Sequence, residues 1–107
     1  MNQKQRKKLL DCLANEIALL LGEKLDRVLL YGSYARNEGR SDSDLDILIV
    51  VRGEFDYAAM IRQTSELIAR LSLENDIVVS RAFISKERFE NECSPFTLNV
   101  RREGIAI

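Results

Sequence analysis

The sequence predicts an α/β (α+β) fold, a small mixed β-sheet with helices packed on it. Three observations support this prediction: two short apolar runs at 27–31 and 45–51, a third at 76–84, and helical apolar spacing in the segments around them. The chain has 107 residues, of which 46% are hydrophobic and 31% charged. That length and balance are typical of one globular domain, so we expect residues 1–107 to form a single domain.

The first predicted element is a helix over residues 3–21. Leu9, Leu13 and Ile17 recur at helical spacing, and Gly22 is a typical residue just beyond a helix end. Lys4, Arg6, Lys7 and Lys8 lie in the first turns, where the helix dipole disfavours cations. They form either a solvated helix start or a contact with an acidic or nucleic-acid partner.

The remaining elements follow from run length and from capping residues. Strands 27–31 and 45–51 flank a polar loop and are expected to pair antiparallel. A helix over 56–72 would cross over to the third strand, 76–84. Ser85 predicts a helix start for 86–92, and Ser94-Pro95 predicts another for 95–103.

Composition excludes several classes of function. The 16 basic and 17 acidic residues nearly cancel, so the overall charge does not favour direct nucleic-acid binding. The chain has no histidine, which excludes histidine-dependent triads and histidine-ligated zinc. Cys12 and Cys93 match no metal spacing; they can close one disulfide, but reduced thiols in a cytoplasmic protein are the favoured interpretation. No apolar stretch is long enough to span a membrane, and the amphipathic N-terminus lacks a signal-peptide cleavage site.

Two carboxylates at the start of the second predicted strand indicate a candidate metal site. Asp44 and Asp46 are two residues apart, so they share one face of an otherwise apolar strand. Paired carboxylates repel each other and lose hydration there, unless a hard cation such as Mg²⁺ lies between them. A solvated turn with alternating acids is the alternative.

Three further groups would complete a nucleotide site. Gly32 and Ser33 end the first strand, where backbone N–H groups and a hydroxyl can hold phosphate. Asp76 opens the predicted third strand and can reach the same metal ions, or it simply caps that strand. Arg36 and Arg40 can neutralise phosphate charge, or pair with Glu38 or Asp42 within the loop.

These residues resemble a known family. Gly32-Ser33, ten residues, then Asp44 and Asp46 is similar to the signature of the nucleotidyltransferase superfamily related to DNA polymerase beta. The run GSYARNEGRSDSDLDILIV, the order of strands and the short C-terminal segment look like the MNT group of minimal nucleotidyltransferases. Members of that group are antitoxins of HEPN/MNT toxin–antitoxin pairs. Asn37 departs from the common Ala-Arg-Gly-Glu loop, and no catalytic acid is missing.

The resemblance implies a palm-type sheet and a specific reaction. Gly32 and Ser33 would bind the nucleotide, and Arg36 joins them because of its place in the loop, while Asp44, Asp46 and Asp76 would be catalytic and carry two Mg²⁺ ions. AMP from ATP would pass to a tyrosine hydroxyl of a partner HEPN ribonuclease toxin, which is thereby silenced. Neutralisation by binding and occlusion, without catalysis, is the alternative.

The short chain bears on the acceptor as well. Larger relatives carry a second domain that grips a small molecule or an RNA, and few residues follow the third strand here. We therefore expect a protein partner that docks, or a homo-oligomer that completes the site. Transfer to a small molecule or to nucleic acid is a third and less favoured hypothesis.

Overall fold

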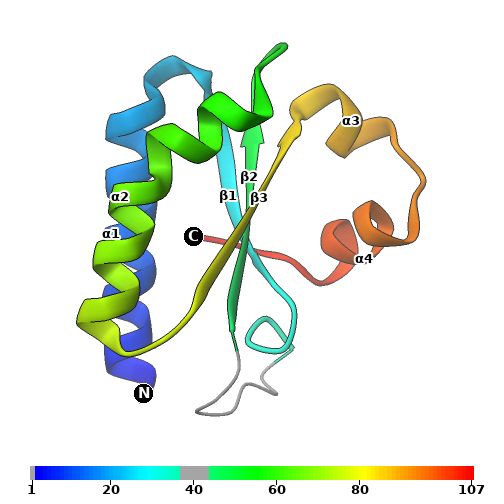
Figure 1. Ribbon diagram of the computed structural model, residues 1–107. Coiled ribbons are helices and arrows are strands. Elements are labelled where there is room, and N and C mark those ends of the chain that lie inside the picture. The colour runs from blue at the N-terminus through cyan, green and yellow to red at the C-terminus, as the bar shows by residue number, and fades with distance from the viewer. Residues whose placement is uncertain (1, 37–43) are drawn as a thin grey trace.

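The computed structural model describes residues 2–36 and 44–107, which form a four-stranded sheet between two layers of helices (Figure 1). The elements are α1 (Gln3–Leu21), a 3₁₀ turn (Gly22–Lys24), β1 (Leu25–Tyr31), β2 (Leu45–Val51), α2 (Tyr57–Asn75), β3 (Val79–Ser85), α3 (Lys86–Asn91), α4 (Pro95–Glu103) and β4 (Ile105–Ala106). The strand order is β3-β2-β1-β4. β1 is antiparallel to both β2 and β4, and β2 is parallel to β3. The predicted mixed sheet is therefore confirmed.

The helix ends follow local capping chemistry. The side chain of Asn2 accepts a hydrogen bond from the backbone of Gln5, and the side chain of Gln5 accepts one from the backbone of Asn2. Gly22 ends α1 as predicted, with φ at +57°. Asp56, Ser85 and Ser94 cap α2, α3 and α4, and the latter two were predicted.

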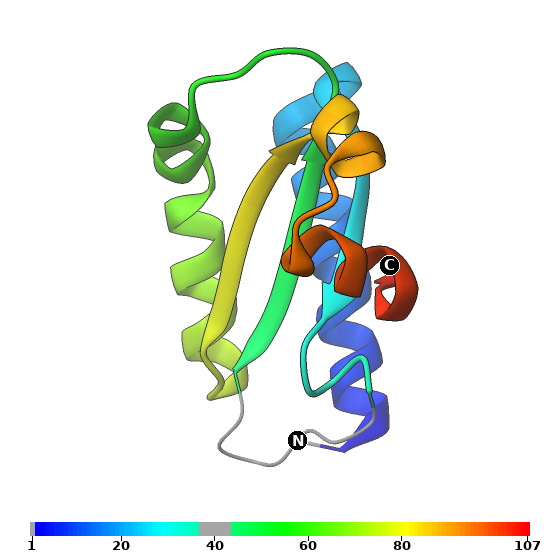
Figure 2. The same ribbon diagram turned by 90° about the vertical axis from the view of Figure 1, so that its right-hand side faces the viewer.

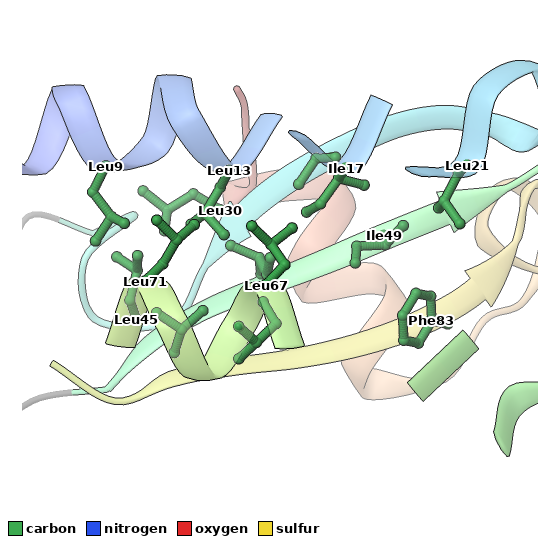
Figure 3. Close-up of a cluster of buried hydrophobic side chains, with 14 of the residues drawn as sticks. Leu9, Leu13, Ile17, Leu21, Leu30, Leu45, Ile49, Leu67, Leu71 and Phe83 are labelled. Atoms are coloured by element: carbon green, nitrogen blue, oxygen red, sulfur yellow. The ribbon is translucent and has the colours of Figure 1, made fainter. Parts of the chain in front are cut away.

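The main core lies between the sheet and the layer formed by α1 and α2 (Figure 3). Alternate residues of β2 point toward these helices, because successive side chains of a strand face opposite ways. This set is Leu45, Ile47, Ile49 and Val51, each fully buried. It packs on the helical stripe Leu9, Leu13, Ile17 and Leu21, which the sequence periodicity predicts.

A second, smaller core lies on the opposite face. Leu48 and Val50 of β2 pack there with Ile84 of β3, Phe89 of α3 and Val100 of α4. Figure 2 shows α3 and α4 in front of the strands on this side. Asp46 belongs to the same alternating set as Leu48 and Val50, so its carboxylate lies on the face covered by α4.

Two sequence predictions need correction. The third strand begins at Val79 and not at Asp76, because α2 extends to Asn75 and Asp76 ends it in the left-handed conformation, with φ at +50°. β4 was not predicted, since two residues carry no periodic signal; it pairs with Leu29 and Leu30.

Cys12 and Cys93 are free thiols, as expected. Within residues 2–36 and 44–107, every helix falls short of the length and apolarity that a membrane span requires.

Candidate nucleotide and metal site

The end of β1 and the start of β2 meet at one edge of the sheet. Tyr31 is paired with Asp46 in the antiparallel register, so Gly32 follows β1 directly beside the carboxylate. The sequence predicted that Gly-Ser and Asp-x-Asp would lie at the same edge, and the register confirms this arrangement for Gly32 and Asp46.

Gly32 is in close contact with Asp46. Its φ is +75°, and a Cβ added to it would lie 2.5 Å from Oδ2 of Asp46. Both the backbone conformation and the absent side chain are therefore needed at this position. The carboxylate of Asp46 occupies the space that any larger residue would fill.

A tight turn follows Gly32. The backbone N–H of Arg36 donates to the carbonyl of Gly32 at 3.3 Å, which closes one helical turn over Ser33. Tyr34 is buried in the main core, with the guanidinium of Arg6 5.6 Å from its ring centroid. Arg36 forms an ion pair with Glu103 of α4 at 3.6 Å. Arg40, the second predicted phosphate ligand, lies outside the described residues, as do Glu38 and Asp42.

The two carboxylates at the start of β2 differ in environment: Asp44 directly precedes the strand, and Asp46 lies within it. Asp44 is exposed, whereas Asp46 is half-buried. Burial raises the pKa of the Asp46 carboxyl above its ordinary value, and the charge of Asp44 raises it further. The pKa of Tyr31 is raised by burial and then by the charge of Asp46. Negative charge is therefore concentrated at this edge.

This edge fits a divalent cation. Neither Asp44 nor Asp46 forms a salt bridge with any residue in the described ranges 2–36 and 44–107. Two like charges close together, with no counter-charge among the described residues, provide the oxygen donors that Mg²⁺ prefers. Asp44 and Asp46 would hold it, and the ion would neutralise phosphate charge.

Asp76, the third predicted acid, lies outside β3. It lies exposed at the end of α2, where its backbone N–H donates to the carbonyl of Ser72. Within the described part of the chain, no three acidic, histidine or cysteine side chains form a cluster suited to a metal. Asp44, Asp46 and Asp76 all belong to that part. The part of Asp76 as a third ligand stays a prediction.

Sequence reasoning missed two neighbours of Asp46. Ser80 of β3 is its partner in the parallel register. On the β1 side, the ring of Tyr31 packs edge-on against Phe96 of α4, with centroids 5.4 Å apart. Phe96 keeps 42% of its surface exposed, so α4 forms an aromatic border of the site. Residues 80, 82 and 84 alternate along β3, which places Ser80 on the same face as Ala82 and Ile84. That alternation identifies Ser80 as a neighbour of Asp46 only when the register of β3 against β2 is known.

Comparison with known proteins agrees with this geometry. Residues 15–94 match the family model described as "Polymerase beta, Nucleotidyltransferase". One curated relative, from Methanocaldococcus jannaschii, is named "Putative protein adenylyltransferase"; it is 38% identical over 71 residues, which are 66% of this chain and 71% of the relative.

Solved structures share the fold. A crystal structure titled "putative nucleotidyltransferase", from Sulfolobus solfataricus, has a TM-score of 0.63 at 17% identity and covers 96% of this chain and 82% of that one. A toxin–antitoxin structure, MntA-HpeT, has a TM-score of 0.53 at 26% identity and covers 87% and 69%. The segment that matches the family model, residues 15–94, includes both β1 and β2 and therefore both Gly32 and Asp46. This chain is a nucleotidyltransferase and belongs to the polymerase beta nucleotidyltransferase family.

Proposed function

We propose that this chain is an antitoxin that transfers AMP from ATP to a tyrosine hydroxyl of a partner HEPN toxin and thereby silences it. The observation that carries the proposal is the junction of Gly32 with Asp46, where only 2.5 Å separates a Cβ position from a carboxylate oxygen. The glycine end of β1 is suited to a triphosphate, and the carboxylates of β2 to the divalent ions that accompany it. We assign nucleotide binding to Gly32, Ser33 and Arg36.

The reaction needs little covalent chemistry from the protein. The phenolic oxygen of the acceptor forms a bond to the α-phosphorus of ATP, the bond from that phosphorus to the bridging oxygen breaks, pyrophosphate leaves, and the phenolic proton passes to water. Divalent ions, when bound, offset the charge on the phosphates. In this proposal Gly32 and Ser33 position the phosphates, and the acceptor hydroxyl approaches beside Asp46.

A protein acceptor is favoured by two findings. A relative at 38% identity is named as a protein adenylyltransferase, and the toxin–antitoxin structure is 26% identical with a TM-score of 0.53. The site also lies at an edge of the sheet, where Phe96 and Val78 remain 42% and 61% exposed. A docked partner would therefore meet exposed apolar side chains near Asp44 and Asp46.

The test is intact-mass spectrometry of a candidate HEPN partner protein after co-expression with this chain. We expect a gain of whole adenylyl units with the wild type and none with the Asp44→Asn/Asp46→Asn double variant. Asp11→Asn, an acid-to-amide change at an exposed position of α1, is the matched control and should support full modification.

Two outcomes would contradict the proposal. Modification by the double variant at the wild-type rate would remove the carboxylates from the reaction. A partner that is silenced and co-purified yet never modified would indicate neutralisation by occlusion instead.

A further inference from the structure

Ser80 is the residue of β3 that faces the carboxylate pair. β2 and β3 run parallel, and the register pairs Leu45 with Val79 and Asp46 with Ser80. Neighbouring strands lie about 4.8 Å apart, so residues in register on the same face are in contact range. Ala82 and Ile84, which continue the alternation from Ser80, lie on the face of the second core. Ser80 therefore shares the face of Asp46.

Ser80 is half-buried, and its hydroxyl has no hydrogen-bond partner among the described residues. Within residues 2–36 and 44–107 the structure contains no hydrogen bond from its side chain, although Ser65, Ser85 and Ser94 all have one. A polar side chain on a sheet face, beside a carboxylate and without a protein partner, is suited to a ligand from solution.

Asp76 is less suited to the same task. Its backbone is tied to α2 by the hydrogen bond to Ser72, and the left-handed conformation turns the chain before β3 begins. The first backbone hydrogen bond between this segment and β2 is made by the carbonyl of Val78, which accepts from the N–H of Leu45 at 2.8 Å. Asp76 thus precedes the point at which the segment joins the sheet.

We propose that Ser80, and not Asp76, is the third oxygen ligand beside Asp44 and Asp46, so that the metal site of this chain has two carboxylates and one hydroxyl. The inference rests on the proposed function, because it places the divalent ions at the same sheet edge. It predicts a weak site for the metal alone, since carboxylate charge sets much of the affinity for a divalent cation.

The test is a titration with Mn²⁺ alone. Binding is monitored by the electron paramagnetic resonance signal of the free ion and by the rise in melting temperature that Mn²⁺ causes. Ser80→Asp adds a carboxylate beside Asp46, and we expect Mn²⁺ to bind about tenfold more tightly. The metal-free variant should melt below the wild type, because it gains a like charge, and Mn²⁺ should raise its melting temperature more than it raises that of the wild type.

Controls separate charge from position. Leu19→Asp places the same added charge at an 84% exposed site on α1, away from the Asp44 edge, and should bind Mn²⁺ as the wild type does. Ser80→Ala, which is compatible with a strand, should weaken binding, whereas Asp76→Asn should leave it unchanged.

The failure of this inference differs from failure of the function. If Asp76→Asn weakens Mn²⁺ binding and neither Ser80 variant alters it, Asp76 is the third ligand and the inference on Ser80 is overturned, while the proposed reaction stands. If the Asp44→Asn/Asp46→Asn variant binds Mn²⁺ like the wild type, the metal site itself is wrong, and both proposals fail.

Discussion

At the scale of single residues, the site depends on how closely a backbone approaches a side chain. Gly32 combines a φ of +75° with an Oδ2 of Asp46 located where its Cβ would be. The first property disfavours any L-residue, and the second disfavours any side chain. Gly53 has a similar φ of +78° and nothing within 4 Å of a Cβ. The two glycines therefore allow conformation and contact to be measured separately.

Replacement of Gly32 by alanine should cost more stability than replacement of Gly53. Gly53→Ala introduces only left-handed strain, about 1 kcal/mol. Gly32→Ala adds the clash with Asp46, which we expect to raise the cost by at least about 1 kcal/mol. Chemical denaturation of both variants measures the difference. In an Asp46→Ala background the excess should vanish, because Oδ2 is gone; an excess that persists would show that the clash is not its source.

At the scale of elements, one carboxylate joins three segments at the end of the sheet opposite the site. The side chain of Asp26 in β1 is only 6% exposed and pairs with Arg27 at 2.6 Å, with Arg52 just after β2 at 3.4 Å, and with Lys86 of α3 at 3.6 Å. Burial alone would raise the pKa of Asp26, but the hydrogen bond and charge of Arg27, together with Arg52 and Lys86, hold it below the ordinary value of 3.8.

Acid should remove this contribution to stability. Because the folded pKa of Asp26 is below the unfolded one, its ionised form stabilises the fold above the ordinary value of 3.8, and that stabilisation is lost as the pH falls through the folded pKa. Asp26→Asn should therefore lower the free energy of unfolding by about 1 kcal/mol at neutral pH and by little in strong acid. Denaturation across a pH series tests this, with Asp11→Asn as an exposed control. Equal losses at both extremes would count against the ion cluster.

At the scale of the whole molecule, periodicity predicted the layers and the sheet, and motif spacing predicted which strand ends would meet. The stripe from Leu9 to Leu21 and the run from Leu45 to Val51 are strong signals, because each is repeated over several turns or residues. The contact of Gly32 with Asp46 could also be predicted, because it follows once β1 and β2 are antiparallel neighbours.

The rest depended on tertiary contacts that no local pattern encodes. Arg81 lies in a strand between Val79 and Phe83, yet its guanidinium is accommodated because Nε donates to Thr64 at 2.7 Å and Nη2 donates to the carbonyl of Ile61 at 2.9 Å. Asp76 reads as the start of a strand, because isoleucine and valines follow it, but the helix before it extends further than its apolar spacing indicates. The register of β3, and with it Ser80, depends on that boundary.

The central position of β2 has a consequence for motion. It is hydrogen-bonded to β1 on one side and to β3 on the other, and both cores cover its faces. Amide protons from Ile47 to Val50 should therefore exchange with solvent only on global unfolding, whereas those of β4 should exchange through local fraying. Hydrogen–deuterium exchange read by NMR would reveal this gradient, and fast exchange in β2 would contradict it. If this prediction holds, the proposed catalytic carboxylates at the start of β2 are held in place before any ligand arrives, and control of the proposed reaction would act on what approaches them.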